Sequence, residues 1–325
     1  IALWSEGIFP ERDPSLNWHY PLPGDSSQYI WDWDNRLPRE KHVYKINPEC
    51  GYVWNANNTP LNCTCEEENP ERDWIGVQRF TYNRGDRFTR LFNQFEAEDI
   101  SWEDYKAIKY DKCYDPEGTY MHSFGKLYEM DPNQYPKIGD ALAHIQQWNL
   151  CGEVTDDHAA LGTLIHHYVY KESGQRMAIW MLREQVVPEP MLAKAVAKAK
   201  DFLMDRYGKL NVRLGAFQKH LRGSLSLPVG GMREVPFAIQ EKIDEKRGIA
   251  INRGGETFVQ FTKWKDGQPE IYTSNTHGVS AEPDSPHYTD QMSAFVNEKL
   301  RRVYLDVEKI KTIAVEKYHP VKCAD

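Results

Sequence analysis

Hydrophobic residues recur at helical spacing through the middle third of the chain. Side chains three or four positions apart line one face of a helix, because successive residues turn by about 100°. Such runs cover residues 105–108, 138–148, 160–168 and 192–203. Ser101 is placed to cap the first run, Pro190 precedes the first turn of the last, and Gly208 follows it, as helix starts and ends require. This pattern predicts a mostly helical region over residues 93–215.

The two ends of the chain show a different pattern. Residues 1–92 are dense in Trp, Tyr, Pro, Asn and Gly, and apolar runs such as 51–54 predict short strands between long ordered loops. Residues 257–262 alternate with period two, and Asp266-Gly267 provides a hairpin turn. The tail over 289–313 is predicted to be helical. The whole pattern indicates an α+β domain, with parts at 1–92 and 216–325 interrupted by a helical insertion at 93–215.

Composition excludes two broad classes of protein. The 325 residues include 40 Lys+Arg against 48 Asp+Glu, a net charge of -8, so we expect no general nucleic-acid partner. The mean hydropathy is -0.70 and the longest apolar run, 177–182, is too short to span a membrane. The first residue is Ile and no signal segment follows it, so we expect the chain to begin partway through a longer protein.

The cysteines leave the cellular compartment open. There are 6, an even set that an exported protein can pair, but they are too dilute for a disulfide scaffold. Cys63 and Cys65 with Cys50 and His42 suggest zinc, but the spacing lacks the usual C-x2-C pair. A disulfide or plain thiols are the favoured interpretation.

Generic catalytic motifs do not occur in this chain. There is no P-loop, dinucleotide fingerprint, H-E-x-x-H or G-x-S-x-G. His166 and His167 are adjacent in a helical stretch and point about 100° apart, so a shared metal is not favoured. Arg84-Gly85-Asp86 spells an adhesion tripeptide that we attribute to chance. The densest polar cluster is NANNTP at 55–60, where an amide can donate to an oxyanion or merely form an Asx-turn.

Short motifs follow one another in a specific order. They are IALWSEGIFPER at 1–12, PLPG at 21–24, WDW at 31–33, NPECGYV at 47–53, NANNTP at 55–60, LPVGG at 227–231 and SPHYTDQ at 285–291. Arg84 followed by Phe88, Leu91 and Phe92 adds a further match. Together they resemble the penicillin acylase family of N-terminal nucleophile (Ntn) hydrolases. The match is weaker at GVSA, 278–281, and at Leu214-Gly215, and the region 95–205 matches only in character.

The resemblance implies a fold and an activity. The fold is the Ntn-hydrolase αββα sandwich, of which this chain is expected to be the C-terminal part, with an inserted helical domain. The activity is hydrolysis of a small-molecule linear amide by a bacterial periplasmic or extracellular heterodimer, in which self-cleavage exposes a Ser whose α-amine is the general base. The partners are the α chain and the N-terminal part of the β chain. That Ser is expected upstream of Ile1, so this chain alone is predicted to be inactive.

The same resemblance assigns site residues. Asn57 is expected to donate its side-chain amide to the oxyanion, and Arg84 to orient Asn57 and the amine, with a surface ion pair as the alternative for Arg84. No cofactor is required for the chemistry, but a structural calcium ion is expected to bind the carbonyl of Pro14 and the carboxylate of Asp73, since calcium prefers oxygen ligands. In the SPHYTDQ motif, Asp290 is predicted to cap a helix.

Two other functions are compatible with the sequence. One is a non-catalytic descendant that keeps the scaffold as a ligand-binding or interaction module. The other is a carbohydrate-binding protein, which the 10 Trp and 18 Tyr suggest, although the Trp residues lie mainly where the family also places aromatics. The natural substrate is undetermined, because family members act on β-lactam side chains, acyl-homoserine lactones and lipopeptides.

Overall fold

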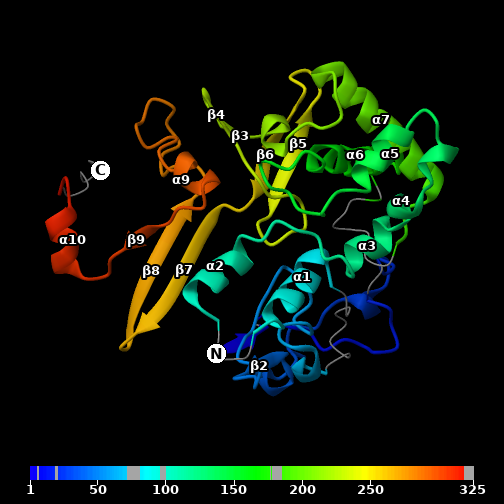
Figure 1. The fold of residues 1–325 in the computed structure, drawn as a ribbon. Helices are drawn as coiled ribbons and strands as arrows, with labels where there is room; N and C mark the ends of the chain where they lie inside the picture. The colour runs from blue at the N-terminus through cyan, green and yellow to red at the C-terminus, as the bar shows by residue number, and fades with distance from the viewer. Residues whose placement is uncertain are drawn as a thin grey trace. The chain divides into compact units, whose positions relative to one another are not determined.

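The computed structural model describes residues 1–5, 7–18, 21–71, 81–95, 100–175, 177 and 185–317 (Figure 1). They form two compact units, Ile1–Lys219 with Pro228–Gly255, and His220–Leu227 with the described residues from Glu256 onward. Each unit combines helices and strands, so the fold is α+β as predicted. Among the described helices, none has the length and apolar character needed to cross a bilayer. The predicted domain boundaries at residues 92 and 215 were drawn from changes in secondary structure, and they remain a prediction.

The first unit is mainly helical. Its α-helices are α1 (Asn83–Phe92), α2 (Trp102–Lys109), α3 (Thr119–Phe124), α4 (Lys126–Glu129), α5 (Gly139–Ile145), α6 (Ala159–Glu172), α7 (Glu189–Tyr207) and α8 (Leu214–Phe217). Single 3-10 turns occur at η1 (Ser27–Tyr29), η2 (Arg39–Lys41), η3 (Glu66–Glu68) and η4 (Pro132–Gln134). Two predicted helix ends are confirmed: Ser101 forms a capping box with Asp104, and Gly208, whose φ is 69°, is the C-cap of α7. Pro190 lies within the first turn of α7 and not ahead of it.

The core of this unit lies among α3 to α8. The apolar faces predicted from the sequence are buried there, including Leu142, Ile145, Leu161, Leu164, Leu192 and Val196. Gly162 on α6 allows the ring of Trp148 to lie close to the helix, because a Cβ at this position would be only 2.6 Å from Cζ3 of Trp148. Trp148 therefore packs directly on the backbone of α6, and a larger residue at 162 would push the two apart.

Two short sheets contain strands of the first unit, and the larger one also takes in residues 220–227, which are assigned to the second. β1 (Ala2–Trp4) pairs antiparallel with β2 (Tyr44–Ile46). In the larger sheet, with strand order β4-β3-β6-β5, β5 (Ile239–Asp244) pairs antiparallel with β6 (Ile249–Gly255), and β3 (Gln218–Arg222) joins β6 in parallel. β4 covers Leu225–Pro228.

One strand expected in this unit is not present. Residues 52–54 are not part of a sheet, because their backbone bonds to their own loop. The amide of Trp54 donates to the carbonyl of Cys63, and the carbonyl of Tyr52 accepts from the hydroxyl of Thr64. The backbone groups that a strand would present to a neighbour are thus satisfied locally.

The second unit is built on an antiparallel sheet. β7 (Phe258–Lys265), β8 (Gln268–Asn275) and β9 (Arg301–Val303) lie in sequence order. The predicted hairpin is confirmed, since Asp266 and Gly267 have φ of 50° and 73° between the paired ends of β7 and β8. The alternation is also confirmed, with Val259 and Phe261 buried.

The tail of this unit corrects two predictions. A continuous helix over 289–313 is wrong: α9 (Met292–Val296) and α10 (Val307–Ile313) are separated by β9, whose backbone bonds to β8. The predicted N-cap is also wrong. Gln291 holds that position without a side-chain bond, while the carboxylate of Asp290 contacts Nδ1 of His287 at 2.9 Å.

His166 on α6 lies among aromatic side chains. Its ring packs against those of Tyr114, Tyr120, Phe124 and Trp148, and its Nε2 lies 3.2 Å from the hydroxyl of Tyr120. Burial lowers the pKa of His166 to about 3. The ring of His166 is thus accounted for by its packing in the aromatic cluster, which is consistent with a structural interpretation of the His166-His167 pair.

We predict that this histidine makes the unit acid-sensitive. Its pKa is below the unfolded value, so the unfolded state binds more protons between about pH 3 and 6.5, and stability falls as the pH drops through that window. In urea unfolding, His166→Phe should remove about 2 kcal/mol of the stability difference between pH 7 and about pH 5. The exposed His122→Phe is the control and should keep the wild-type difference. An unchanged difference in His166→Phe would contradict the prediction.

Candidate active site

Helix α1 positions the candidate site through its first turn. The side chain of Asn83 is buried and bonded at both ends: Nδ2 donates to the carbonyl of Glu234 at 2.6 Å, and Oδ1 accepts from the amide of Asp115 at 2.8 Å. The first turn of α1 is thereby joined to two segments that lie far from it in sequence. Both are needed to place the next residue, Arg84.

The guanidinium of Arg84 bridges two side chains. Nη1 donates to Oδ1 of Asn57 at 3.1 Å, and Nε donates to the carboxylate of Glu234 at 3.3 Å. The side chains of Arg84 and Glu234 are 19% and 13% exposed, so the ion pair is half-buried. The structure thus brings together the two residues predicted from the sequence, and the ion pair expected as the alternative for Arg84 coexists with its contact to Asn57.

The contact with Arg84 fixes which way the amide of Asn57 points. An arginine side chain only donates hydrogen bonds, so Asn57 must turn its oxygen toward Arg84 and its NH2 group away. Among the described residues, that NH2 group has no hydrogen-bond partner, and Asn57 is exposed. Two N–H groups are therefore available to an acceptor outside the described chain.

The loop around Asn57 is held by its own amides. Asn57 has a φ of 62°, a left-handed conformation that asparagine tolerates better than most residues, and its backbone N–H donates to Oδ1 of Asn55. The buried Asn58 accepts from the amide of Ala56 and donates to the carbonyls of Thr59 and Asn62. The Asx-turn interpretation of this cluster is thus correct for Asn55, whereas the side chain of Asn58 bonds to other parts of the loop and that of Asn57 contacts Arg84.

Two faces of α1 fix its position by different means. Gly85, Phe88 and Phe92 lie against an aromatic cluster, where a Cβ on Gly85 would be only 2.9 Å from Cη2 of Trp54. On another face, Asn83, Arg87 and Arg90 follow the i, i+4, i+7 spacing. The apolar face sets how close the helix lies to the loop of Asn57, and the polar face sets its rotation.

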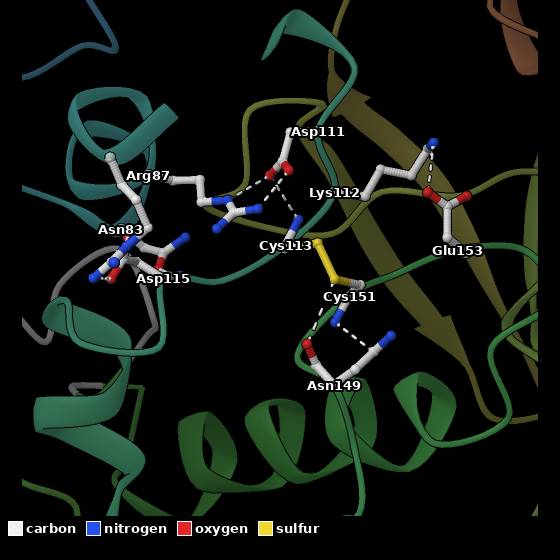
Figure 2. A network of polar contacts seen from close by, with 10 residues as sticks. Asn83, Arg87, Asp111, Lys112, Cys113, Asp115, Asn149, Cys151 and Glu153 are labelled. Atoms are coloured by element: carbon white, nitrogen blue, oxygen red, sulfur yellow. Dashed lines mark hydrogen bonds and ion pairs between the residues drawn. A yellow bond between two sulfur atoms is a disulfide. The ribbon is translucent and has the colours of Figure 1, made fainter. Parts of the chain in front are cut away.

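The polar face forms two bidentate ion pairs, and Figure 2 shows the one between Arg87 and Asp111. Nε and Nη2 of Arg87 donate to Asp111 at 2.9 and 2.8 Å, and Nε and Nη2 of Arg90 donate to Asp115 at 2.6 and 3.1 Å. Arg90 also pairs with Glu117, and these carboxylates raise the pKa of its guanidinium. Forked pairs of this kind fix direction as well as distance.

The partner segment is itself anchored. Cys113 is joined to Cys151 by a disulfide, and its amide donates to Asp111 at 3.0 Å, while the neighbouring Lys112 pairs with Glu153 (Figure 2). All three residues of the tripeptide Arg84-Gly85-Asp86 make contacts within this unit. Asp86 accepts hydrogen bonds from the amide and hydroxyl of Thr119 at the start of α3. Its attribution to chance as an adhesion motif is consistent with these contacts.

The calcium prediction is only partly covered by the structure. Pro14 lies in an exposed turn, and Asp73 lies outside the described residues. Calcium takes six to eight oxygens, of which the carbonyl of Pro14 would be one. The prediction plays no part in the chemistry considered below.

Glu234, Asp111 and Asp115 were not predicted from the sequence. Glu234 lies three residues after the LPVGG motif and has a φ of 57°, but nothing in the local pattern distinguishes it from other surface acids. A cavity of about 840 Å³ lies between α6 and β5 and is lined by neither Asn57 nor Arg84. The candidate site is therefore defined by its contacts, and not by that cavity.

Comparison with known proteins identifies the family. The family model described as penicillin amidase matches residues 1–312. The chain belongs to the penicillin amidase family. Penicillin G acylase from Escherichia coli is 32% identical over 80 residues, which are 23% of this chain and 8% of that protein.

A solved structure supports the fold. The thermostable penicillin G acylase from Alcaligenes faecalis superposes with a TM-score of 0.56 at 15% identity, covering 100% of this chain and 66% of the other. The chain thus spans just under two thirds of the solved chain, and the similarity shows a penicillin acylase-like fold.

We predict that Asp115 is the main anchor of α1. Its carboxylate is only 3% exposed and accepts from Arg90 and from the amide of Glu117, so Asp115→Asn should lower the free energy of unfolding by about 2 kcal/mol. Glu117→Asn, on the exposed partner of the same arginine, should cost about 0.5 kcal/mol or less. Urea unfolding of both variants measures the difference, and equal losses would show that burial at Asp115 is unimportant.

Proposed function

We propose that this chain is the C-terminal part of the β chain of a processed amidase that hydrolyses a linear amide between an acyl group and an amine. The observation that carries the proposal is the orientation of Asn57, whose NH2 group faces away from Arg84 and has no partner among the described residues. Family membership supports the same chemistry, since the penicillin amidase model matches most of the chain.

The proposed reaction begins at a Ser upstream of this chain. Its hydroxyl attacks the amide carbonyl, its own α-amine accepts the hydroxyl proton, and the carbonyl oxygen becomes an oxyanion. Asn57 donates a hydrogen bond to this oxyanion, an interaction that is strongest in the transition state. The amine then leaves with a proton, and water releases the acyl group from the Ser. Arg84, held by Glu234, keeps the Asn57 donor directed outward.

The remaining expectations are part of the same proposal. The partners are the α chain and the N-terminal part of the β chain, which would supply the nucleophile and the acyl pocket. The protein is periplasmic or extracellular, an assignment that a disulfide between Cys113 and Cys151 favours. A structural calcium ion at Pro14 and Asp73 belongs to this proposal as well, with metal analysis of the purified protein as its test.

The oxyanion role predicts a large loss of turnover in Asn57→Gly. Glycine keeps the left-handed backbone without strain but removes the amide, so kcat should fall by about 10² to 10³ while KM changes little. Arg84→Ala, which keeps the amide but frees its orientation, should give a smaller loss. Hydrolysis of a panel of chromogenic acyl-anilides by the full protein provides the measurement.

A matched control for this variant lies in the same part of the chain. Asn47 is also exposed and left-handed, with a φ of 45°, and Asn47→Gly should leave kcat within about twofold. If Asn57→Gly retained turnover within about threefold of wild type, the oxyanion assignment would be wrong.

Processing provides a test that needs no substrate. We predict that intact mass and N-terminal sequencing of the natively produced full protein will find two chains, the larger beginning with Ser and containing residues 1–325. Self-cleavage is expected because the α-amine that serves as base exists only after the peptide bond before the Ser is broken. A single uncleaved chain would instead favour a non-catalytic ligand-binding or interaction module.

A further inference from the structure

Two cysteine side chains meet at the ends of the segment that carries Asn57. Cys50 precedes residues 51–64 and Cys65 follows them, and the sulfur atoms of both lie with a carboxylate oxygen of Glu68 within 4.8 Å of one another. Both thiols are half-buried. Both are free thiols in the structure, and sulfur atoms this close, from residues that bracket a loop, can hold a metal together or bond to each other after a small movement.

The surroundings of Glu68 disfavour a metal. One carboxylate oxygen is paired with the ammonium of Lys45 at 3.0 Å, and the other accepts from the amide of Cys50 at 3.0 Å and the thiol of Cys65 at 3.3 Å. A divalent cation would therefore compete with the charge of Lys45. In the described part of the chain this group also supplies only three ligand atoms, whereas a structural zinc site uses four.

A disulfide elsewhere in the same unit indicates the conditions under which the chain folds. Cys113 and Cys151 are bonded, and such bonds form and persist in oxidising compartments. We propose that Cys50 and Cys65 form a second disulfide in the mature protein, which closes the loop that carries Asn57.

The step balances with a common oxidant. The two thiols lose two protons and two electrons as the sulfur–sulfur bond forms, and the electrons reduce the disulfide of a thiol oxidoreductase to two thiols. The exchange passes through a mixed disulfide between one of these cysteines and that oxidant.

Cys63 is the competing partner, and its environment disfavours it. Its side chain is fully buried, and its sulfur does not belong to the close group that the ligand atoms of Cys50, Cys65 and Glu68 form. Its backbone is also fixed, with the amide donating to Oδ1 of Asn69 and the carbonyl accepting from Trp54.

The bond has a consequence for the candidate site, which rests on the proposed function. Residues 51–64 contain no helix or strand, and their ends are joined by single hydrogen bonds, such as those of Trp54 to Cys63 and of Thr64 to Tyr52, and not by a ladder. A covalent link between its ends removes many of its open conformations. Cys50 and Cys65 are then positioning residues for Asn57, whose donor must lie within hydrogen-bonding distance of the oxyanion to act.

Disulfide mapping tests the bond without any substrate. The full protein, purified without reductant, is alkylated with iodoacetamide in denaturant, digested and analysed by mass spectrometry. We expect a peptide pair linking Cys50 to Cys65 beside the Cys113–Cys151 pair, with Cys63 alkylated. Alkylation of both Cys50 and Cys65, with or without an equivalent of zinc by elemental analysis, would overturn the proposal, as would a link between Cys50 and Cys63.

Kinetics of variants test the positioning role. In Cys50→Ser/Cys65→Ser, kcat should fall about three- to tenfold with KM unchanged, well below the temperature at which the variant unfolds. Cys63→Ala removes a thiol from the same loop but no cross-link, and should keep kcat within about twofold. Equal kcat in the double variant and wild type would overturn the positioning role. If the double variant does not fold, the mapping of the wild-type protein still decides whether the bond exists.

Discussion

The candidate site depends on one hydrogen bond, from the guanidinium of Arg84 to the side-chain oxygen of Asn57. Arginine has donors and no acceptor, so this bond allows the amide of Asn57 only one orientation. A residue that both donates and accepts would permit either orientation, and the NH2 group would then face outward only part of the time. The same guanidinium is held by Glu234, so that its own direction is limited as well.

The position of Arg84 in turn depends on α1, which is fixed by two kinds of force. Packing of Gly85 and Phe88 on Trp54 brings the helix close, but apolar contact is non-directional and allows rotation. The bidentate pairs of Arg87 and Arg90 are directional and set that rotation. Neither force alone would place a guanidinium to within hydrogen-bonding distance of two separate partners.

The sequence predicted the local parts of this arrangement better than the distant ones. Helix ends such as Ser101 and Gly208 depend on a few neighbouring residues, and the buried faces of α5, α6 and α7 follow from periodicity. Asn57 and Arg84 were predicted through a resemblance in motif order. Glu234 and Asp115 were missed because their roles depend on contacts with α1, from which no local pattern follows. The tail was misjudged for the same reason, since the pairing of β9 with β8 competes with helix formation and is not visible in residues 289–313 themselves.

The two side-chain partners of Arg84 both have a left-handed backbone, with φ of 62° at Asn57 and 57° at Glu234. A left-handed backbone costs free energy in such residues and persists only where the surroundings hold it. Here the side chain of Asn55 bonds to the backbone of Asn57, and the side chain of Asn83 bonds to the backbone of Glu234. The contacts of Arg84 span 27 and 150 positions of sequence. Contacts of such separation form only once the intervening chain is in place, because closing long loops costs entropy that local contacts do not offset. The orientation of Asn57 therefore depends on the folding of the rest of the first unit as well as on its own loop.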